Sequence, residues 1–160
     1  MQLDLAGKRA LVTGGTSGIG RAIVAQLISS GCVVTCTGVD QASVDRLADS
    51  EAQAVCLDVT NDDQVDELVS AQKSLDILVN CAGTILREGR EFDLTGFKRV
   101  LDVNLTGTMS MCSAFRPQLA TSNGCVVNLA SMLSFFGSGY VPGYSASKGG
   151  VVQLTKSLAI

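Results

Sequence analysis

The chain has 160 residues, of which 46% are hydrophobic and 17% charged, and its net charge is −3. This is the balance of a folded globular protein, and the length suits a single domain over residues 1–160 with its own core. The acidic balance offers no basic face to nucleic acid, and no apolar run approaches the roughly 18 residues that span a bilayer, so we expect neither partner.

Apolar, strand-like runs alternate with helical stretches along the whole chain. In chain order, we expect strands at 9–13, 33–37, 54–57, 76–79 and 125–129, and helices at 18–30, 41–49, 61–71, 95–116 and 143–160. Strands rich in Val, Ile and Leu without polar alternation are typical of a parallel sheet covered on both faces. The pattern predicts a Rossmann-like, doubly wound α/β fold with strand order 3-2-1-4-5 and a ligand crevice between strands 1 and 4.

A glycine-rich turn, Thr13–Gly20, follows the first strand. Its spacing is G-x-x-x-G-x-G. Glycines permit a tight turn and let a pyrophosphate approach the backbone, and the start of the next helix offers free N–H groups to phosphates. The motif predicts a dinucleotide site, although a purely structural strand-to-helix turn stays open at this point.

An asparagine interrupts the apolar stripe of the long helix expected at 95–116. A buried amide without partners costs about 1–3 kcal/mol, so Asn104 needs a hydrogen-bonding role, either structural or functional. The stripe consists of Phe97, Leu101, Asn104, Thr108, Met111 and Phe115.

Tyr144 and Lys148 stand four residues apart and share one face of the last helix. An ammonium close to a phenol favours the phenolate, which a tyrosine acting as acid or base near neutral pH requires. Taken alone, such a pair is more often a surface pair. Ser131 lies just past the fifth strand, at the end of the sheet where ligands bind.

The cysteine and histidine counts narrow the chemistry. The six cysteines form no Cys-x-x-Cys pair, and several lie in apolar runs, so we expect buried free thiols and a cytoplasmic location. Histidine is absent, so we expect no metal site, and proton chemistry has to use Tyr, Lys, Ser, Asp or Glu. Residues 1–8 lack the basic and apolar segments of a secretory signal.

Together these motifs resemble the short-chain dehydrogenase/reductase family along the whole chain. The resemblance rests on the turn Thr13–Gly20, the Asn-Cys-Ala-Gly segment at 80–83, Asn104 in the long helix, and Ser131, Tyr144 and Lys148 with a 13-residue gap from serine to tyrosine. The family's second asparagine in the 80–83 segment is replaced here by Cys81.

The resemblance implies an oxidoreductase that interconverts a secondary alcohol and a ketone by hydride transfer to or from NAD(P). The resemblance also implies a role for each catalytic residue. Tyr144 exchanges a proton with the substrate oxygen, and Ser131 hydrogen-bonds the substrate. Lys148 promotes ionisation of Tyr144 and binds the nicotinamide ribose. Asn104 holds a water that links Lys148 to solvent. The residues expected to bind the cofactor are Gly14, Thr16, Ser17, Gly18, Ile19, Gly20, Asp40, Asp58, Val59, Asn80, Ala82, Gly83, Tyr144 and Lys148.

A second tyrosine and a second serine lie near the catalytic candidates but do not fit the spacing of the family. Tyr140 has no lysine four residues later, and Pro142 interrupts a helix there. Ser134 lies too close to Tyr144 for the family's spacing, but it remains a candidate for the substrate pocket.

The cofactor preference is sought at the end of the second strand, which reads Thr37-Gly38-Val39-Asp40. The family's usual acid at 38, for a ribose diol, and arginine at 39, for a 2′-phosphate, are both absent. Asp40 would repel a 2′-phosphate if it points inward. We therefore expect NAD rather than NADP.

Family members usually continue for two more strands and a loop that closes over the substrate. We therefore expect the chain to be truncated and residues 1–160 alone to turn over poorly. The family often dimerises through its two long helices, so we expect a homo-oligomer through 95–116 and 143–160. A dinucleotide-binding module without turnover, or an inactive fragment, remains the alternative.

Two segments predict the class of substrate, because they resemble the corresponding segments of sugar-acid and polyol dehydrogenases. They are residues 131–135 and the Ile-Leu-Arg-Glu run at 85–88. Arg87 is either a partner for a substrate carboxylate or a solvated surface arginine. Both readings stay open.

Overall fold

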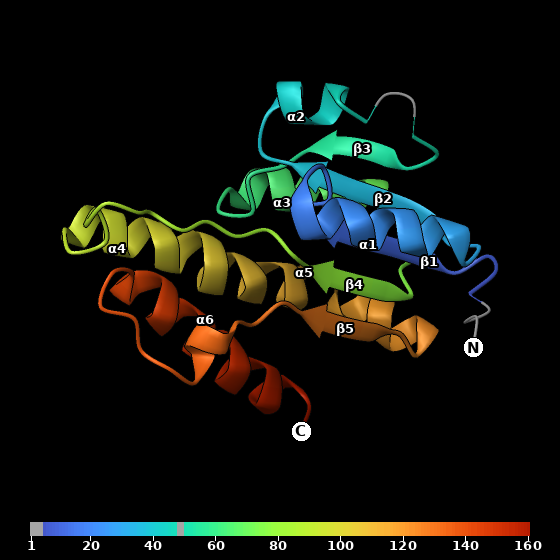
Figure 1. Cartoon of the computed structure of the whole chain (residues 1–160). Helices are drawn as coiled ribbons and strands as arrows, with labels where there is room; N and C mark the ends of the chain where they lie inside the picture. Colours follow the sequence, from blue (N-terminus) through green and yellow to red (C-terminus); the bar gives the residue numbers. More distant parts are fainter. Residues whose placement is uncertain (1–4, 48–49) are drawn as a thin grey trace.

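The computed structural model describes residues 5–47 and 50–160, with strands and helices in alternation (Figure 1). The strands are β1 (Arg9–Thr13), β2 (Val33–Gly38), β3 (Gln53–Cys56), β4 (Ile77–Asn80) and β5 (Cys125–Asn128). The helices are α1 (Gly18–Ser29), α2 (Gln41–Asp45), α3 (Asp62–Ala71), α4 (Leu94–Leu101), α5 (Gly107–Ser122) and α6 (Pro142–Leu158), with a π-helical turn η1 (Asp102–Thr106) and a short 3-10 helix η2 (Met132–Ser134).

All five strands are parallel, and their order is β3-β2-β1-β4-β5. This confirms the fold class and the strand order predicted from the sequence. β2 and β3 extend the sheet on one side of β1, whereas β4 and β5 extend it on the other side. The strand order therefore reverses between β1 and β4. A crevice forms at such a point because the connections after the two strands diverge to opposite faces.

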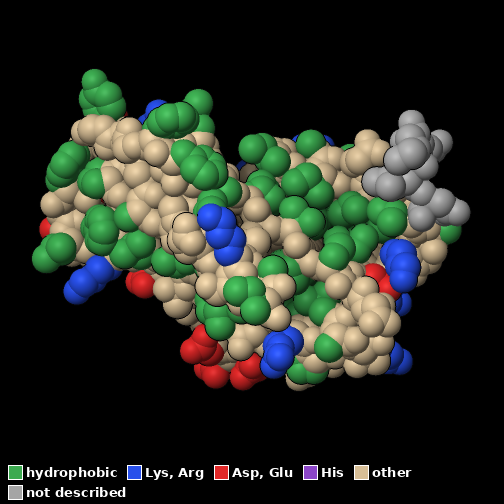
Figure 2. Space-filling view, turned by 90° about the horizontal axis from the view of Figure 1, so that it is seen from below, with side chains coloured by type: hydrophobic (Ala, Val, Ile, Leu, Met, Phe, Trp, Pro, Cys, Tyr) green, Lys and Arg blue, Asp and Glu red, His purple; other side chains and the backbone are tan. Residues whose placement is uncertain are grey.

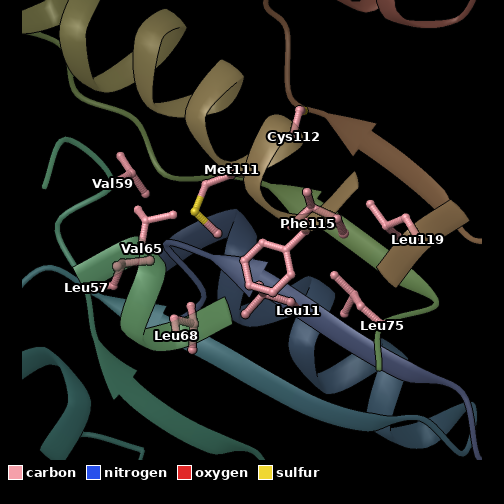
Figure 3. Packing of buried hydrophobic residues seen from close by; sticks show 11 residues of the cluster. Leu11, Leu57, Val59, Val65, Leu68, Leu75, Met111, Cys112, Phe115 and Leu119 are labelled. Carbon is pink, nitrogen blue, oxygen red and sulfur yellow. The ribbon is translucent and has the colours of Figure 1, made fainter. Parts of the chain in front are cut away.

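The sheet is covered on both faces, and alternate side chains of β1 enter two separate cores. Leu11 packs on one face against α3 and α5, where it lies beside Phe115 (Figure 3). Ala10 and Val12 pack on the other face against Val24 of α1. Burial on both faces is the reason that the strands read as unbroken apolar runs in the sequence.

The stretch expected as one helix at 95–116 is divided in the structure, which corrects that prediction. Between α4 and α5 the N–H of Gly107 bonds to the carbonyl of Asp102, five residues back, which defines the wide turn η1. A Cβ atom at Gly107 would lie 2.5 Å from Cγ2 of Val59, so the glycine lets this turn pack closely on the segment after β3.

The end of the same helix was also placed too early, at Arg116. Pro117 lies inside α5, although its ring removes one helical hydrogen bond. The turn after it is held from outside the helix: Leu119 is buried in the core, and the side-chain amide of Gln118 donates to the carbonyls of Val69 and Gln72.

Other boundaries differ by one or two residues, except that of the second helix. The structure ends α2 at Asp45, whereas the sequence predicted a helix to 49. Residues 48 and 49 lie outside the described part of the chain. Asp40 caps this short helix by accepting a hydrogen bond from the backbone N–H of Ser43 at 2.7 Å.

The face formed by β5 and α6 shows hydrophobic side chains at its surface (Figure 2). Val126 and Val127 of the edge strand are exposed, and so are Leu158 and Ile160. A groove of about 750 Å³ runs between α5 and the end of α6 beside this strand. Within residues 5–47 and 50–160, no helix combines the length and the apolar character needed to cross a membrane.

Candidate active site

A cleft of about 550 Å³ opens at the carboxyl ends of β1 and β4, where the strand order reverses. The glycine turn forms one wall, and Tyr144 and Lys148 of α6 lie on the other. The segments after β2 and β3 line its far end. The structure brings into this one cleft every residue that the sequence predicted to bind the cofactor, with the exception of Asn80.

The glycine turn is shaped by backbone contacts that a side chain would block. Gly14 has φ +63°, and a Cβ atom there would lie 2.8 Å from Cα of Ala82. A Cβ atom at Gly20 would collide with the carbonyl of Gly14. Ser17 precedes α1 without capping it through its side chain, so the first N–H groups of the helix face the cleft. This backbone cradle fits a dinucleotide pyrophosphate.

Charged side chains gather at the far end of the cleft. The Asp58 carboxylate accepts hydrogen bonds from the Thr60 N–H at 2.9 Å and hydroxyl at 2.7 Å, and Arg99 lies 3.3 Å away. Partial burial would raise the pKa of Asp58, but the bonds from Thr60 and Arg99 outweigh it and hold that pKa below its usual value. Asp40 and Arg46 line the same end.

Tyr144 and Lys148 lie on one face of α6, with the Lys148 Nζ atom 5.9 Å from the centre of the Tyr144 ring. Lys148 is 7% exposed, and its ammonium donates a 2.7 Å hydrogen bond to the carbonyl of Leu129 at the end of β5. Burial lowers the pKa of Lys148, and the nearby Cys81 side chain opposes that shift. The pair therefore places a phenol and a largely desolvated ammonium together in the cleft wall.

Ser131 lies at the edge of this site and is not among the residues that line the cleft. Its hydroxyl accepts a hydrogen bond from the N–H of Leu133, which caps η2. Ser134 completes the cap, because its hydroxyl oxygen accepts a hydrogen bond from the Ser131 N–H. The same hydroxyl donates a hydrogen bond to the carbonyl of Lys148 at 2.8 Å. Ser134 thus fastens η2, and Ser131 with it, to the helix that carries Lys148.

Asn104 lies in the π-helical turn η1 and is 0% exposed. Its amide oxygen accepts from the N–H of Thr84 at 2.7 Å, and its amide nitrogen donates to the Thr84 carbonyl at 2.9 Å and to the Ser147 hydroxyl at 3.0 Å. The amide therefore joins the loop after β4 to α6. A Cβ atom at Gly83 would lie 3.3 Å from Asn104 Oδ1 and 3.8 Å from Lys148 Nζ, so both side chains reach the same point of the cleft.

Asn80 lies beneath the cleft rather than in its lining. It is 3% exposed, and its amide nitrogen donates to Asn128 at 2.9 Å and to the sulfur of Cys112 at 3.3 Å. These bonds join the ends of β4 and β5 below the floor. The floor itself is held by Thr13, whose hydroxyl accepts from the backbone N–H groups of Cys81 and Ala82 at 3.1 Å.

Several lining residues escaped the sequence analysis. Arg99 lies in α4 and pairs with Asp58, from which it is separated by 41 positions in the sequence. No local sequence pattern predicts a contact over that separation. Ser43 lies in the short helix after β2 and Arg46 directly follows that helix, and no motif of the sequence pointed to either residue. Arg87, the candidate partner for a substrate carboxylate, is exposed and is not among the lining residues. Within the described residues, no cluster of acidic or cysteine side chains has the arrangement of a metal site.

Comparison with known proteins gives a consistent picture. The chain matches the short chain dehydrogenase family over residues 8–160. An L-fucose dehydrogenase of Mus musculus is 35% identical to this chain, in an alignment that covers 96% of the chain and 59% of the relative. A 3-oxoacyl-(acyl-carrier-protein) reductase of Aquifex aeolicus is also 35% identical, over 99% of the chain and 69% of the relative. The ligand-free aldohexose dehydrogenase of Thermoplasma acidophilum aligns with a TM-score of 0.89 at 28% identity, over 99% of the chain and 63% of that structure. The chain thus spans between 59% and 69% of these three proteins.

Proposed function

This chain belongs to the short-chain dehydrogenase family, and on that basis we propose that it is an oxidoreductase that interconverts a secondary alcohol and a ketone with NAD(P) as cofactor. The observation that carries the proposal is the pairing of Tyr144 with the buried Lys148, opposite a glycine turn whose backbone is open to a pyrophosphate. The nicotinamide supplies or accepts the hydride when the cofactor is bound.

The side chains divide the remaining work. Tyr144 transfers the proton to or from the substrate oxygen. The Lys148 ammonium stabilises the phenolate, which accepts the proton when an alcohol is oxidised and is left behind when a ketone is reduced. Ser131 hydrogen-bonds the substrate oxygen from the start of η2. Asn104 holds the loop after β4 against α6 through Thr84 and Ser147, and thereby fixes the part of the cleft that Thr84 and Lys148 line.

Tyr144→Phe tests the proposal, because it removes only the phenolic oxygen. Turnover of alcohol by the full-length enzyme should fall by at least about 100-fold, the lower range for loss of a general acid or base. Tyr140→Phe is the matched control, since Tyr140 is 83% exposed and stands one helical turn away in the sequence. Equal rates for wild type and Tyr144→Phe would refute the proposal in favour of a dinucleotide-binding module without turnover.

NAD is the proposed cofactor, in preference to NADP. Asp40 lines the far end of the cleft, and its negative charge supports NAD, because NADP carries an additional negatively charged 2′-phosphate. The arginine nearest to it in sequence, Arg46, lines the same end and is the group that would favour NADP instead. Fluorescence titration of the protein with NADH and NADPH decides between them, and tighter binding of NADPH would overturn this choice.

A polyhydroxylated substrate, a sugar acid or a polyol, is the proposed class. The L-fucose and aldohexose dehydrogenases are similar to this chain and act on sugars according to their names, whereas the similar Aquifex protein is named for a 3-oxoacyl thioester. A rate screen of sugar acids, polyols, 3-oxoacyl esters and steroids with both cofactors separates these classes. Preference for the acyl esters or steroids would overturn the proposed class.

A homo-oligomer in the cytoplasm completes the proposal. The helices expected at its interface carry exposed apolar residues, Met109 of α5 and Leu158 of α6. Light scattering after gel filtration would measure the mass, and a monomer would overturn the proposed assembly. Cys32, Cys36 and Cys112 are buried free thiols, which suits a reducing compartment. A thiol count on the denatured, unreduced protein tests this, with six free thiols expected.

A further inference from the structure

Glu91 is a buried carboxylate for which the sequence gave no role. It is 1% exposed, belongs to the loop after β4, and its side chain reaches the start of α6. One oxygen accepts the backbone N–H of Leu86 at 2.8 Å, and the other accepts the backbone N–H of Tyr144 at 2.8 Å. A carboxylate withdrawn from water needs such donors. Glu91 therefore joins one wall of the cleft to the residue proposed as acid and base.

The residue before Tyr144 is shaped to admit this carboxylate. A Cβ atom at Gly143 would lie 3.2 Å from Oε2 of Glu91 and 3.3 Å from Cδ2 of Phe97. Gly143 has no positive φ, so the glycine is not needed for its backbone conformation. The space that it leaves is occupied by Glu91 and Phe97, and a side chain there would press on the carboxylate.

The first turn of α6 has a specific need for this contact. Pro142 begins the helix, so the N–H of Tyr144 belongs to the first turn, where no helical carbonyl precedes it as an acceptor. Glu91 supplies that acceptor from outside the helix. Without it, the turn that carries Tyr144 would end in a free N–H group inside the protein.

A second buried side chain runs parallel to the first. Asn104 binds the loop at Thr84 and reaches α6 at Ser147, whereas Glu91 binds the same loop at Leu86 and reaches α6 at Tyr144. The loop and the helix are thus joined at two points. These two joins, Ser147 and Tyr144, fall within one turn of α6, so together they constrain the turn that carries Tyr144.

We propose that Glu91 is a positioning residue that sets the location of Tyr144 relative to Lys148 and the bound substrate. The proposal rests on the proposed function. Glu91 takes no part in proton transfer; it acts through the backbone of Tyr144. Its loss should therefore lower the rate of the chemical step and leave binding of the cofactor at the distant glycine turn unchanged.

Glu91→Gln is the main variant, because glutamine has the same shape but only one acceptor oxygen, and its NH₂ group would face a backbone N–H. Glu91→Asp keeps the charge but is too short by one methylene to reach both donors. Gly143→Ala leaves Glu91 intact and displaces it. Glu67→Gln is the matched control: it makes the same chemical change at an exposed side chain of α3 that does not line the cleft.

Rates are measured on the full-length enzyme and divided by the concentration of sites that bind NADH. This correction removes any loss of folded protein, which is all that a merely structural role would cause. We expect kcat to fall at least about tenfold in Glu91→Gln and Glu91→Asp, since a misplacement of about 1 Å can cost up to about 100-fold. KM should change by less than about twofold, the pattern of an interaction needed in the transition state. Gly143→Ala should give a smaller loss of kcat, and Glu67→Gln none.

Selective labelling with [15N]tyrosine gives a readout that needs no turnover, because the chain has two tyrosines. The Tyr144 amide signal should move in Glu91→Gln while the Tyr140 signal stays. Wild-type kcat for both Glu91 variants would overturn the positioning role and leave the proposed function standing. An inactive wild type with the amide shift present would instead overturn the proposed function, and the catalytic role of Glu91 with it. Absence of the shift would overturn the contact itself.

Discussion

Asn104 and Ser147 are separated by 43 positions in the sequence, are both fully buried, and share a 3.0 Å hydrogen bond between the Asn104 amide and the Ser147 hydroxyl. Ser147 in turn donates to the carbonyl of Tyr144 at 2.8 Å. The wide turn η1 is therefore in hydrogen-bonded contact with the turn of α6 that carries Tyr144. The bond between Asn104 and Ser147 thus contributes to the stability of the fold and to the position of Tyr144.

Asn104→Ala should destabilise the protein more than Ser147→Ala. The first change leaves the half-buried N–H and carbonyl of Thr84 without their partner, and a fully buried group left unsatisfied costs about 1–3 kcal/mol. The second change removes one acceptor, but the Asn104 amide keeps its bond to the Thr84 carbonyl. Urea unfolding followed by circular dichroism measures both. Equal losses would show that Thr84 finds other partners when Asn104 is absent.

Asp40→Asn should tighten binding of NADPH a few-fold without weakening that of NADH. Asparagine caps a helix as well as aspartate does, so the bond to the Ser43 N–H is kept while the charge is removed. The effect is modest because exposed charges interact weakly through water. Asp45→Asn, in the same short helix but outside the cleft lining, is the control. An unchanged NADPH affinity would mean that Asp40 does not face the 2′ position.

Two consecutive glycines of α6 should differ in their response to substitution by alanine. A Cβ atom at Gly149 would meet only the carbonyl oxygen of Ser134, at 3.7 Å, so Gly149→Ala should stabilise the protein by about 0.5–1 kcal/mol through helix propensity. A Cβ atom at Gly150 would lie 2.7 Å from Cδ2 of Leu105, so Gly150→Ala should lose that gain to crowding. Thermal unfolding compares them, and equal melting temperatures would contradict the prediction.

Acid should weaken the join between the starts of β1 and β4. Asp76 accepts the N–H of Arg9 at 2.9 Å and the ammonium of Lys8 at 2.8 Å, and these bonds hold the pKa of Asp76 below its ordinary value of 3.8. A carboxyl whose pKa is lower in the folded state adds stability that is complete above its unfolded value and is lost as pH falls through the folded value.

The matching measurement is the urea midpoint as a function of pH. For the wild type it should fall as the pH drops from about 5 to below 3.8, and Asp76→Asn should be less sensitive over the same range. Asp58, whose pKa is also lowered, should account for part of the remaining acid sensitivity. Curves of identical slope for wild type and Asp76→Asn would rule out this contribution.

The sequence predicted the strand order, the switch point and most of the cleft because these follow from local patterns. Apolar runs, glycine spacing and the i, i+4 pair of Tyr144 and Lys148 are visible without tertiary information. The carboxyl ends of parallel strands then meet at one edge by topology alone, so residues after β1, β2, β3 and β4 reach one cleft.

What the sequence could not show depends on contacts between distant segments. Pro117 normally argues for a helix end, but Gln118 and Leu119 are held by α3 and the core. Asn80 has the polar character of a ligand-binding residue, yet its partner is Asn128 on the neighbouring strand. Glu91 lies in a loop between Arg90 and Phe92, and only the fold shows that it is buried.

The wide turn η1 sets the rotational phase of the two helices that it connects. A π-helical turn carries one residue more than an α-helical turn, so the side chains of α4 are rotated by about 100° relative to α5 from where an unbroken helix would place them. That extra residue lets Arg99 face Asp58 while Phe115 faces the sheet. Deletion of one residue from η1 should therefore turn the Arg99 side of α4 away from the cleft even where Asn104 is kept, so the length of this segment matters in addition to its buried asparagine.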